Sequence, residues 1–225
     1  MIAKRLKMFE FDMKKRLIYE CDDFIAVLKY SGESYHNDNE DEIGFFNMVR
    51  DELKRDIYSV HRLDKDTSGI MLFAKTPSAQ KELLHLFKER RIEKTYFALS
   101  DKKPKKKMGN IIGDLVSTRG GNYKLTHEKS NPAITRFNSY KGDSGLFFFR
   151  YFPKTGRTHQ LRVVAKSLGS SILGDKRYGG SEYKRMMLHC YKLVFKWKDE
   201  DLTIISIPSE DEFMEFSAYF NAEMK

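Results

Sequence analysis

The sequence predicts an α+β fold built around a mixed, mostly antiparallel central sheet with flanking helices and loops. Short runs rich in Val, Ile, Phe and Tyr recur along the chain and are typical of strands, whereas helical periodicity is rarer and irregularly placed. The regular alternation of strand and helix that would predict a parallel sheet is missing. With 225 residues, 40% of them hydrophobic, the chain can bury a core as one domain, or as one domain built from two lobes.

Eight runs are predicted to be strands, because β-branched and aromatic residues favour the pleated surface of a sheet. They are LIYE (17–20), FIAVLK (24–29), IMLFAK (70–75), TYFALS (95–100), ITRFNSY (134–140), LFFFRYF (146–152), YKLVFKW (191–197) and LTIISI (202–207). Two polar stretches, 100–109 and 118–122, are expected to be exposed loops, and two lobes could divide there.

Helix start signals define two further elements. The clearest helix is predicted to begin at Thr76 and Pro77, a cap followed by a first-turn proline, and to end near Arg91. The last helix is predicted from the capping-box spacing of Ser209 and Glu212. Its buried face consists of three phenylalanines, Phe213, Phe216 and Phe220.

Apolar periodicity predicts a helix over 161–168, closed by Gly169. Its opposite side carries three basic residues, His159, Arg162 and Lys166. That polar side requires a binding partner. A weaker pattern predicts a helix over 42–54.

The charge balance points to an anionic partner. Lys and Arg total 41 against 32 Asp and Glu, which gives a net charge of +9 and a pI near 9.3. A basic segment, residues 1–16, precedes the predicted domain at 17–225, and no stretch of the chain has the apolar length of a signal peptide core or a membrane span. We therefore expect a cytoplasmic protein that binds nucleic acid and not a membrane.

Neither a metal nor a cofactor is predicted. Cys21 and Cys190 lie far apart and form no C-x-x-C pair, so both are expected to be reduced and packed. The six histidines show no metal-ligand spacing, and no Gly-rich phosphate loop is present.

The segment HRLDKDTSGIMLFAKT (61–76) is the most unusual, because polar residues and a turn directly precede an apolar strand. Asp64 therefore lies at the entrance of a core element. An alternative interpretation is that residues 66–69 are ordinary turn residues, Gly69 supplying a positive φ, and that Asp64 hydrogen-bonds the loop.

Two further segments carry candidate functional residues. KTGRTHQLRV (154–163) places Arg157 and Arg162 around the start of a helix, although surface arginines are usually only solvated. EKTYFALS (93–100) places Tyr96 on a strand, where a packing role is the commoner one.

Taken together and in order, these segments resemble the RluA-type family of pseudouridine synthases. HRLDKDTSGIMLFAKT is similar to the family's aspartate motif, RIEKTYFALS to its tyrosine strand, and PKTGRTHQLRV, ILGDKRYGG and MLHCYKLVF to its later motifs. LIYECDDFIAVLKYSG resembles the opening pair of strands and a lysine-containing turn, so the similarity covers most of residues 17–208. The resemblance implies the pseudouridine synthase catalytic fold over 17–225, with an active-site cleft along the sheet.

The resemblance also implies roles for single residues. Asp64 aligns with the aspartate that attacks the ribose anomeric carbon or removes its neighbouring proton, and both routes stay open. Arg162 aligns with the arginine that pairs with this aspartate, which favours the charged carboxylate. Tyr96 aligns with the tyrosine whose ring can stack on uracil and whose hydroxyl serves the removal of the C5 proton.

Other positions are assigned to packing and to RNA contacts. Arg62 aligns with an arginine that enters the RNA near the extruded uridine, or it makes a simple phosphate contact. The walls of the base pocket are expected to be Leu161 and Leu188. His159 is expected to be a hydrogen-bonded turn residue without a catalytic role, and Asp66 and Asp175 are interpreted as turn residues. Candidate RNA contacts are Arg62, Lys65, Arg157, Lys176 and the Lys102–Lys107 run, which is alternatively a solvated loop.

Val164, Ser170 and Ser171 stand where relatives often have histidine and a His-Pro pair, which leaves the subgroup open. The short N-terminus resembles members without an extra RNA-binding domain, which act on ribosomal or transfer RNA. We therefore expect a monomeric isomerase that needs no cofactor and converts uridine to pseudouridine in ribosomal RNA (large subunit) or transfer RNA. The alternatives are a non-catalytic RNA-binding protein or RNA-folding chaperone on the same scaffold, and an N-glycoside hydrolase that shares the first bond cleavage.

Overall fold

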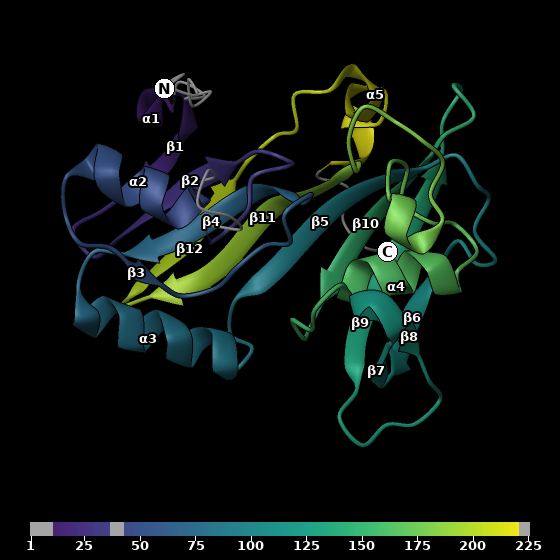
Figure 1. Ribbon diagram of the computed structural model, residues 1–225, viewed down its shortest axis with the longest axis horizontal. Coiled ribbons are helices and arrows are strands. Elements are labelled where there is room, and N and C mark those ends of the chain that lie inside the picture. Colours follow the sequence, from purple (N-terminus) through teal and green to yellow (C-terminus); the bar gives the residue numbers. More distant parts are fainter. Residues whose placement is uncertain (1–10, 37–42, 221–225) are drawn as a thin grey trace, which may run out of the picture.

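A ten-stranded sheet forms the centre of the protein in the computed structural model, which describes residues 11–36 and 43–220 (Figure 1). The strands are β1 (Leu17–Glu20), β2 (Phe24–Lys29), β3 (Tyr58–Ser59), β4 (Ser68–Ala74), β5 (Glu93–Ser100), β6 (Met108–Gly113), β7 (Leu115–Thr118), β8 (Asn122–Leu125), β9 (Ala133–Lys141), β10 (Phe147–Pro153), β11 (Leu188–Trp197) and β12 (Glu200–Ile205). The helices are α1 (Met13–Arg16), α2 (Phe45–Leu53), α3 (Pro77–Lys88), α4 (Gln160–Ser167) and α5 (Asp211–Met214), with 3₁₀ helices η1 (Arg119–Gly121), η2 (Lys176–Tyr178) and η3 (Ser217–Tyr219).

The sheet follows the order β1-β2-β4-β11-β5-β10-β9-β6, with β12 beside β11 and β3 beside β4. Its strand pairs are antiparallel except for β4 and β11, which run parallel. The predicted α+β class with a mixed, mostly antiparallel sheet is therefore confirmed. All eight predicted strands form, while β3, β6 and the separate β7–β8 hairpin were not predicted.

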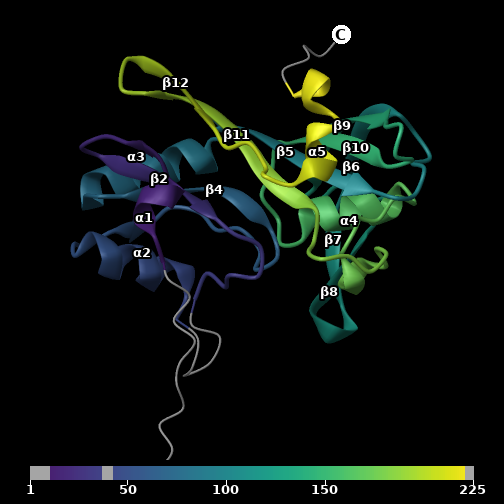
Figure 2. The same ribbon diagram turned by 90° about the horizontal axis from the view of Figure 1, so that it is seen from above.

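The core consists of two clusters that lie next to each other along the sheet. The first packs β2 and β4 with α2 and α3, and the second packs β5, β9 and β10 with α4 and α5 (Figures 1 and 2). Leu99 and Phe137 both belong to the second cluster. The loops at 100–109 and 118–122 lie between these two residues, so the prediction that the loops divide two lobes is wrong. The division instead crosses β5 and β11, and Tyr96 packs against both clusters.

The helix signals were read correctly in three places. Thr76 caps α3 as predicted, since its Oγ1 accepts a hydrogen bond from the backbone N–H of Ala79 at 3.1 Å. α4 ends just before Gly169, which has φ +73° as a closing glycine requires. α2 covers most of the weaker predicted helix, whose first residue, Glu42, lies outside the described residues.

The capping box predicted for the last helix is wrong. Glu210, not Ser209, is the N-cap residue of α5, and it makes no side-chain capping bond. Glu212 instead accepts hydrogen bonds from the Tyr183 hydroxyl and from the Lys184 ammonium, the latter at 2.9 Å. These charge-assisted bonds are stronger than a neutral capping bond. The predicted buried face is correct, and its three rings are Phe213, Phe216 and Phe220. α5 lies on the opposite side of the second half of the sheet from α4 (Figure 2), and the three rings pack there in the second core cluster.

Gly69 permits the single parallel contact of the sheet. Its φ is +116°, and it pairs with Cys190 where β4 meets β11. A Cβ atom at this position would lie 2.4 Å from the Cys190 carbonyl oxygen and 2.5 Å from the Cys190 nitrogen. The two strands can approach this closely only because residue 69 has no side chain.

Gly69→Ala is therefore expected to lower the free energy of unfolding by roughly 2–4 kcal/mol, from backbone strain and overpacking. Urea unfolding monitored by the fluorescence of Trp197 measures it. Gly145→Ala is the matched control, because Gly145 also has a positive φ of +86° but no atom within 4 Å of the place that an added Cβ would take. An equal loss in both variants would contradict the close approach of the two strands.

Candidate active site

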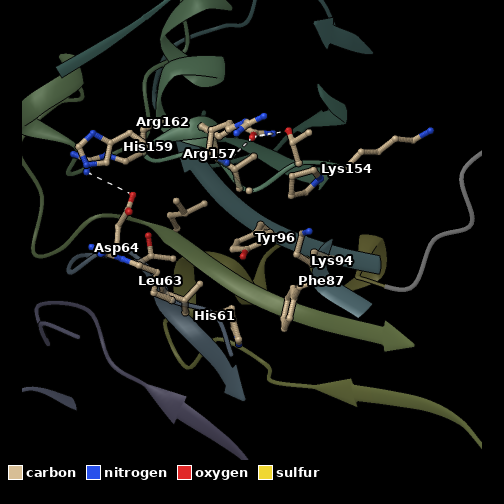
Figure 3. A pocket seen from close by; sticks show the side chains of 18 of the residues that line it. His61, Leu63, Asp64, Phe87, Lys94, Tyr96, Lys154, Arg157, His159 and Arg162 are labelled. Carbon is tan, nitrogen blue, oxygen red and sulfur yellow. Dashed lines mark hydrogen bonds and ion pairs between the residues drawn. The ribbon is translucent and has the colours of Figure 1, made fainter. Parts of the chain in front are cut away.

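A cavity of about 500 Å³ opens over the sheet where the two core clusters meet (Figure 3). Seven of the candidate residues line it: Asp64, Tyr96, Arg162, Arg62, Arg157, Leu161 and Leu188. Lys65 and Lys176 do not line it. Lys65 is exposed on the loop beyond Asp64, and Lys176 forms a 2.6 Å ion pair with Glu182 at the surface.

The cavity has a one-sided charge. Among the described residues that line it, Asp64 is the single carboxylate. Seven Lys and Arg side chains line the same space: Arg62, Lys88, Arg90, Lys94, Lys154, Arg157 and Arg162. Such a wall attracts a polyanion and leaves one acidic group facing it.

Lys29 holds the loop that carries Asp64. Its side chain is fully buried, and Nζ donates to the backbone carbonyls of Asp64 at 3.2 Å, Lys65 at 2.7 Å and Thr67 at 3.0 Å. The Thr67 N–H closes the turn on the Asp64 carbonyl at 3.0 Å. Burial lowers the pKa of Lys29 to about 8, and the carboxylates of Glu33, Asp66 and Asp64 oppose that shift.

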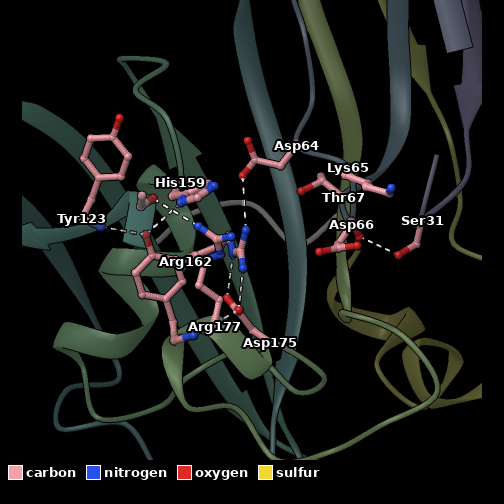
Figure 4. A network of polar contacts seen from close by, with 12 residues as sticks. Ser31, Asp64, Lys65, Asp66, Thr67, Tyr123, His159, Arg162, Asp175 and Arg177 are labelled. Atoms are coloured by element: carbon pink, nitrogen blue, oxygen red, sulfur yellow. Dashed lines mark hydrogen bonds and ion pairs between the residues drawn. The ribbon is translucent and has the colours of Figure 1, made fainter. Parts of the chain in front are cut away.

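This role of Lys29 was not predicted from the sequence. A lysine inside the otherwise apolar run FIAVLK was the signal that could have indicated it. Ser31 adds a further tie to the same loop, because its hydroxyl donates to the Asp66 carbonyl (Figure 4).

Arg162 interacts with two carboxylates, and one of them is much closer than the other. Its Nε and Nη2 donate to Asp175 at 2.8 and 2.6 Å, whereas Nη1 lies 3.9 Å from Asp64 Oδ2 (Figure 4). The predicted pairing with Asp64 is present, but Asp175 is the main partner. Burial opposes the charge of Arg162, and the bonds to Asp175 and the charge of Asp64 raise its pKa above the ordinary value.

Asp175 was interpreted only as a turn residue, and it is one, because its side chain accepts the Tyr178 N–H at the start of η2. Its second function was missed. Asp175 is 1% exposed, and a carboxylate this buried requires a cationic partner, which Arg162 supplies. Sequence spacing cannot reveal this pairing, since the two residues come from a helix and from a turn thirteen residues later.

Tyr96 lies on the face of β5 that lines the cavity (Figure 3). It pairs across the sheet with Cys190 on β11 and with Tyr151 on β10. Burial raises the pKa of Tyr96 well above its usual value, and Cys190 and Asp64 add to the effect. The phenol is therefore protonated at neutral pH.

His61 forms the wall of the cavity next to Phe87, on which its ring stacks with a centroid distance of 4.7 Å. Its Nε2 accepts the backbone N–H of Leu72 at 2.9 Å, so the proton of the neutral ring is on Nδ1. Burial and the charge of Lys94 lower the pKa of His61 to about 3. This histidine ties the segment before Asp64 to β4.

Comparisons with known proteins identify the family of this chain. The family model described as RNA pseudouridylate synthase matches residues 23–167. An uncharacterized RNA pseudouridine synthase of Haemophilus influenzae is 44% identical over 204 residues, which cover 89% of this chain and 91% of the relative. A ribosomal large subunit pseudouridine synthase C of Rickettsia felis is 36% identical over 192 residues, covering 81% of this chain and 63% of the relative.

A solved structure shares the fold. Human RNA pseudouridylate synthase domain containing 4 superposes with a TM-score of 0.75 at 20% identity, covering 94% of this chain and 95% of the human chain. The chain thus belongs to the RNA pseudouridylate synthase family and is an isomerase of RNA. The predicted resemblance and reaction class are confirmed. In the part of the chain that the structure describes, no helix is both long and apolar enough to cross a membrane.

Asp175→Asn is expected to lower the free energy of unfolding by about 3 kcal/mol, because it leaves the buried guanidinium of Arg162 without its main countercharge. Chemical denaturation at pH 7 measures the loss. Glu182→Gln is the matched control, since it removes an exposed carboxylate from Lys176, and no measurable change is expected. A stable Asp175→Asn protein would show that Arg162 does not depend on Asp175.

The buried, neutral His61 predicts a pH-dependent stability. The pKa of His61 in the folded protein is about 3, below the ordinary 6.5. Below pH 6.5 the unfolded chain therefore binds a proton at His61 that the folded chain does not bind. Stability is therefore lost as the pH falls from 6.5 towards 3. His61→Gln keeps an acceptor for Leu72 and should reduce the loss between pH 6 and 5 by about 1 kcal/mol in urea titrations. A slope equal to wild type would contradict a neutral His61.

Proposed function

We propose that Asp64 begins the isomerisation at the anomeric carbon of a uridine that has left its base stack. The single observation that carries this role is the position of Asp64 as the one carboxylate among the described lining residues, inside a wall of seven cations. The N1–C1′ bond breaks, the uracil turns, C5 bonds to C1′, and the C5 proton leaves while N1 gains one. Asp64 serves either as the nucleophile at C1′ or as the base at the neighbouring carbon.

Arg162 and Tyr96 complete the proposed site. Arg162 is locked by Asp175 and presents its remaining Nη1 towards Asp64, which orients the carboxylate without a close salt bridge that would block it. The ring of Tyr96 offers a surface on which the uracil can stack. Because its hydroxyl stays protonated, it can accept the C5 proton only if its own proton is passed on.

The basic wall is proposed to bind the RNA strand. Arg62 and Arg157 contact phosphates, or Arg62 fills the place of the extruded base and so offsets part of a flipping cost of a few kcal/mol. Leu161 and Leu188 wall the base pocket. Lys65 and Lys176, which lie outside the cavity, are proposed contacts for more distant phosphates.

Large-subunit ribosomal RNA is the proposed substrate, and transfer RNA is the second candidate. The name of the Rickettsia relative supports the first, although this chain spans 63% of that relative's length. We further propose that the protein acts as a monomer in the cytoplasm and without a cofactor.

Asp64→Asn is expected to lose turnover by more than a thousandfold while it keeps RNA binding, because only the reacting carboxylate is changed. The assay follows tritium released from C5 of uridine in transcripts of large-subunit ribosomal RNA and of transfer RNAs. Release by wild type and none by Asp64→Asn supports the proposal. Equal RNA binding with no release from either protein identifies an RNA chaperone, and free uracil with an abasic product identifies a hydrolase.

A further inference from the structure

His159 lines the cavity on the side of Arg162, and the fold holds it in an uncommon conformation (Figure 3). Its φ is +56°, in the left-handed region, at the position just before α4. Its side chain does not cap that helix. Holding a non-glycine residue in the left-handed region costs free energy. The contacts around His159 therefore fix its backbone and the position of its ring. The expected hydrogen-bonded turn histidine is present, but its bond uses only one ring nitrogen.

That nitrogen, Nδ1, lies 2.8 Å from the hydroxyl of Tyr178 (Figure 4). The same hydroxyl accepts the backbone N–H of Tyr123 at 3.0 Å, from the β7–β8 hairpin. Arg177 fixes this hairpin by donating to the carbonyls of Gly120 and Gly121 at 3.3 and 3.2 Å. The tyrosine oxygen therefore receives one hydrogen bond from the backbone and has one proton of its own to give.

The direction of the Tyr178–His159 bond follows from that proton. Within the described residues, the His159 ring is the acceptor that lies within hydrogen-bond distance of the hydroxyl. Were Nδ1 the donor, the proton of the buried Tyr178 hydroxyl would have no partner, which costs about 1–3 kcal/mol. Nδ1 is therefore the acceptor.

The imidazole has one proton at neutral pH. Burial lowers the pKa of His159, the charges of Arg162 and Arg177 lower it further, and those of Asp64 and Asp175 oppose the shift. With Nδ1 occupied as an acceptor, that proton is on Nε2. The backbone of the hairpin thus fixes, through Tyr178, a neutral N–H donor in the wall of the cavity.

We propose that the Nε2–H of His159 donates a hydrogen bond to the 2′-hydroxyl of the flipped uridine and so holds the sugar against Asp64. Asp64 and His159 line the same end of the cavity, and Asp64 is close enough to act on the charge of the ring. Asp64 is proposed to face C1′ of the ribose. A side chain next to Asp64 therefore lies beside the neighbouring carbon, C2′, and its hydroxyl. A neutral donor suits a hydroxyl, while Arg62 and Arg157 suit phosphates. The 2′-hydroxyl is also what distinguishes RNA from DNA.

This inference rests on the proposed role of Asp64 at C1′. The test uses transcripts of large-subunit ribosomal RNA and of transfer RNAs. Each transcript is made in two forms, one with ordinary uridine and one with 2′-deoxyuridine at every uridine. Pseudouridine is quantified by nucleoside chromatography after digestion. His159→Asn tolerates the left-handed backbone but cannot reach the place of Nε2, whereas His127→Asn removes an exposed histidine outside the cavity and is the matched control.

His159→Asn is expected to lower kcat/KM about tenfold on the ribose transcripts and to leave the rate on the deoxy transcripts at the wild-type level. His127→Asn should match wild type on both. An equal loss on both transcripts assigns His159 to a phosphate or to packing, and overturns the proposal, as does no loss at all. If wild type forms no pseudouridine on the ribose transcripts, the proposed function fails instead.

The ring itself provides a second measurement that needs no RNA. ¹⁵N spectra of the histidine-labelled protein are expected to show His159 protonated on Nε2 and bare on Nδ1. Tyr178→Phe keeps the ring beside Arg162 but removes the hydroxyl, so both tautomers should then appear. Protonation of Nδ1 in the wild-type protein would overturn the proposal.

Discussion

The buried ion pair of Arg162 and Asp175 is the constraint on which the rest of the site depends. A guanidinium taken out of water needs a carboxylate with matching geometry, and Asp175 supplies two bonds of 2.8 and 2.6 Å. The guanidinium is thereby held in one orientation, with Nη1 3.9 Å from Asp64. Asp64 receives the field of a fixed cation and still has its oxygens available. A single tight Asp64–Arg162 pair would instead have competed with any substrate.

The backbone around Asp64 is fixed by equally local means. Lys29 gathers the carbonyls of the loop, and Gly69 lets β4 reach β11 directly behind it. β11 in turn places Cys190 opposite Tyr96. The parallel strands β4 and β11 therefore position both the loop that carries Asp64 and Tyr96, which lies between the two core clusters. For this reason the cavity forms where the two halves of the sheet meet.

The sequence was most informative where a local pattern and a motif agree. The runs of β-branched and aromatic residues predicted eight strands, and all eight form. The order of the motifs predicted that Asp64, Tyr96 and Arg162 belong to one site, and all three line one cavity. β6 and the β7–β8 hairpin were missed because their burial is weak, with Met108 and Val116 exposed, so no alternation was visible. The partner of Arg162 was missed because it depends on how a turn folds back onto a helix, which no spacing rule contains.

In the proposed function a buried pair, and not the basic wall, orients Asp64, and the charge of the cavity supplies a reason. In the proposed function, RNA phosphates contact and neutralise exposed cations such as Arg62 and Arg157, so the effect of these cations on Asp64 changes when the substrate binds. Arg162 is 5% exposed and already paired with Asp175, so phosphates cannot displace that pairing without desolvating themselves. The cation nearest the carboxylate, Arg162, is therefore one whose state does not change when a polyanion binds, and in the proposed function the exposed cations are left to hold the RNA strand.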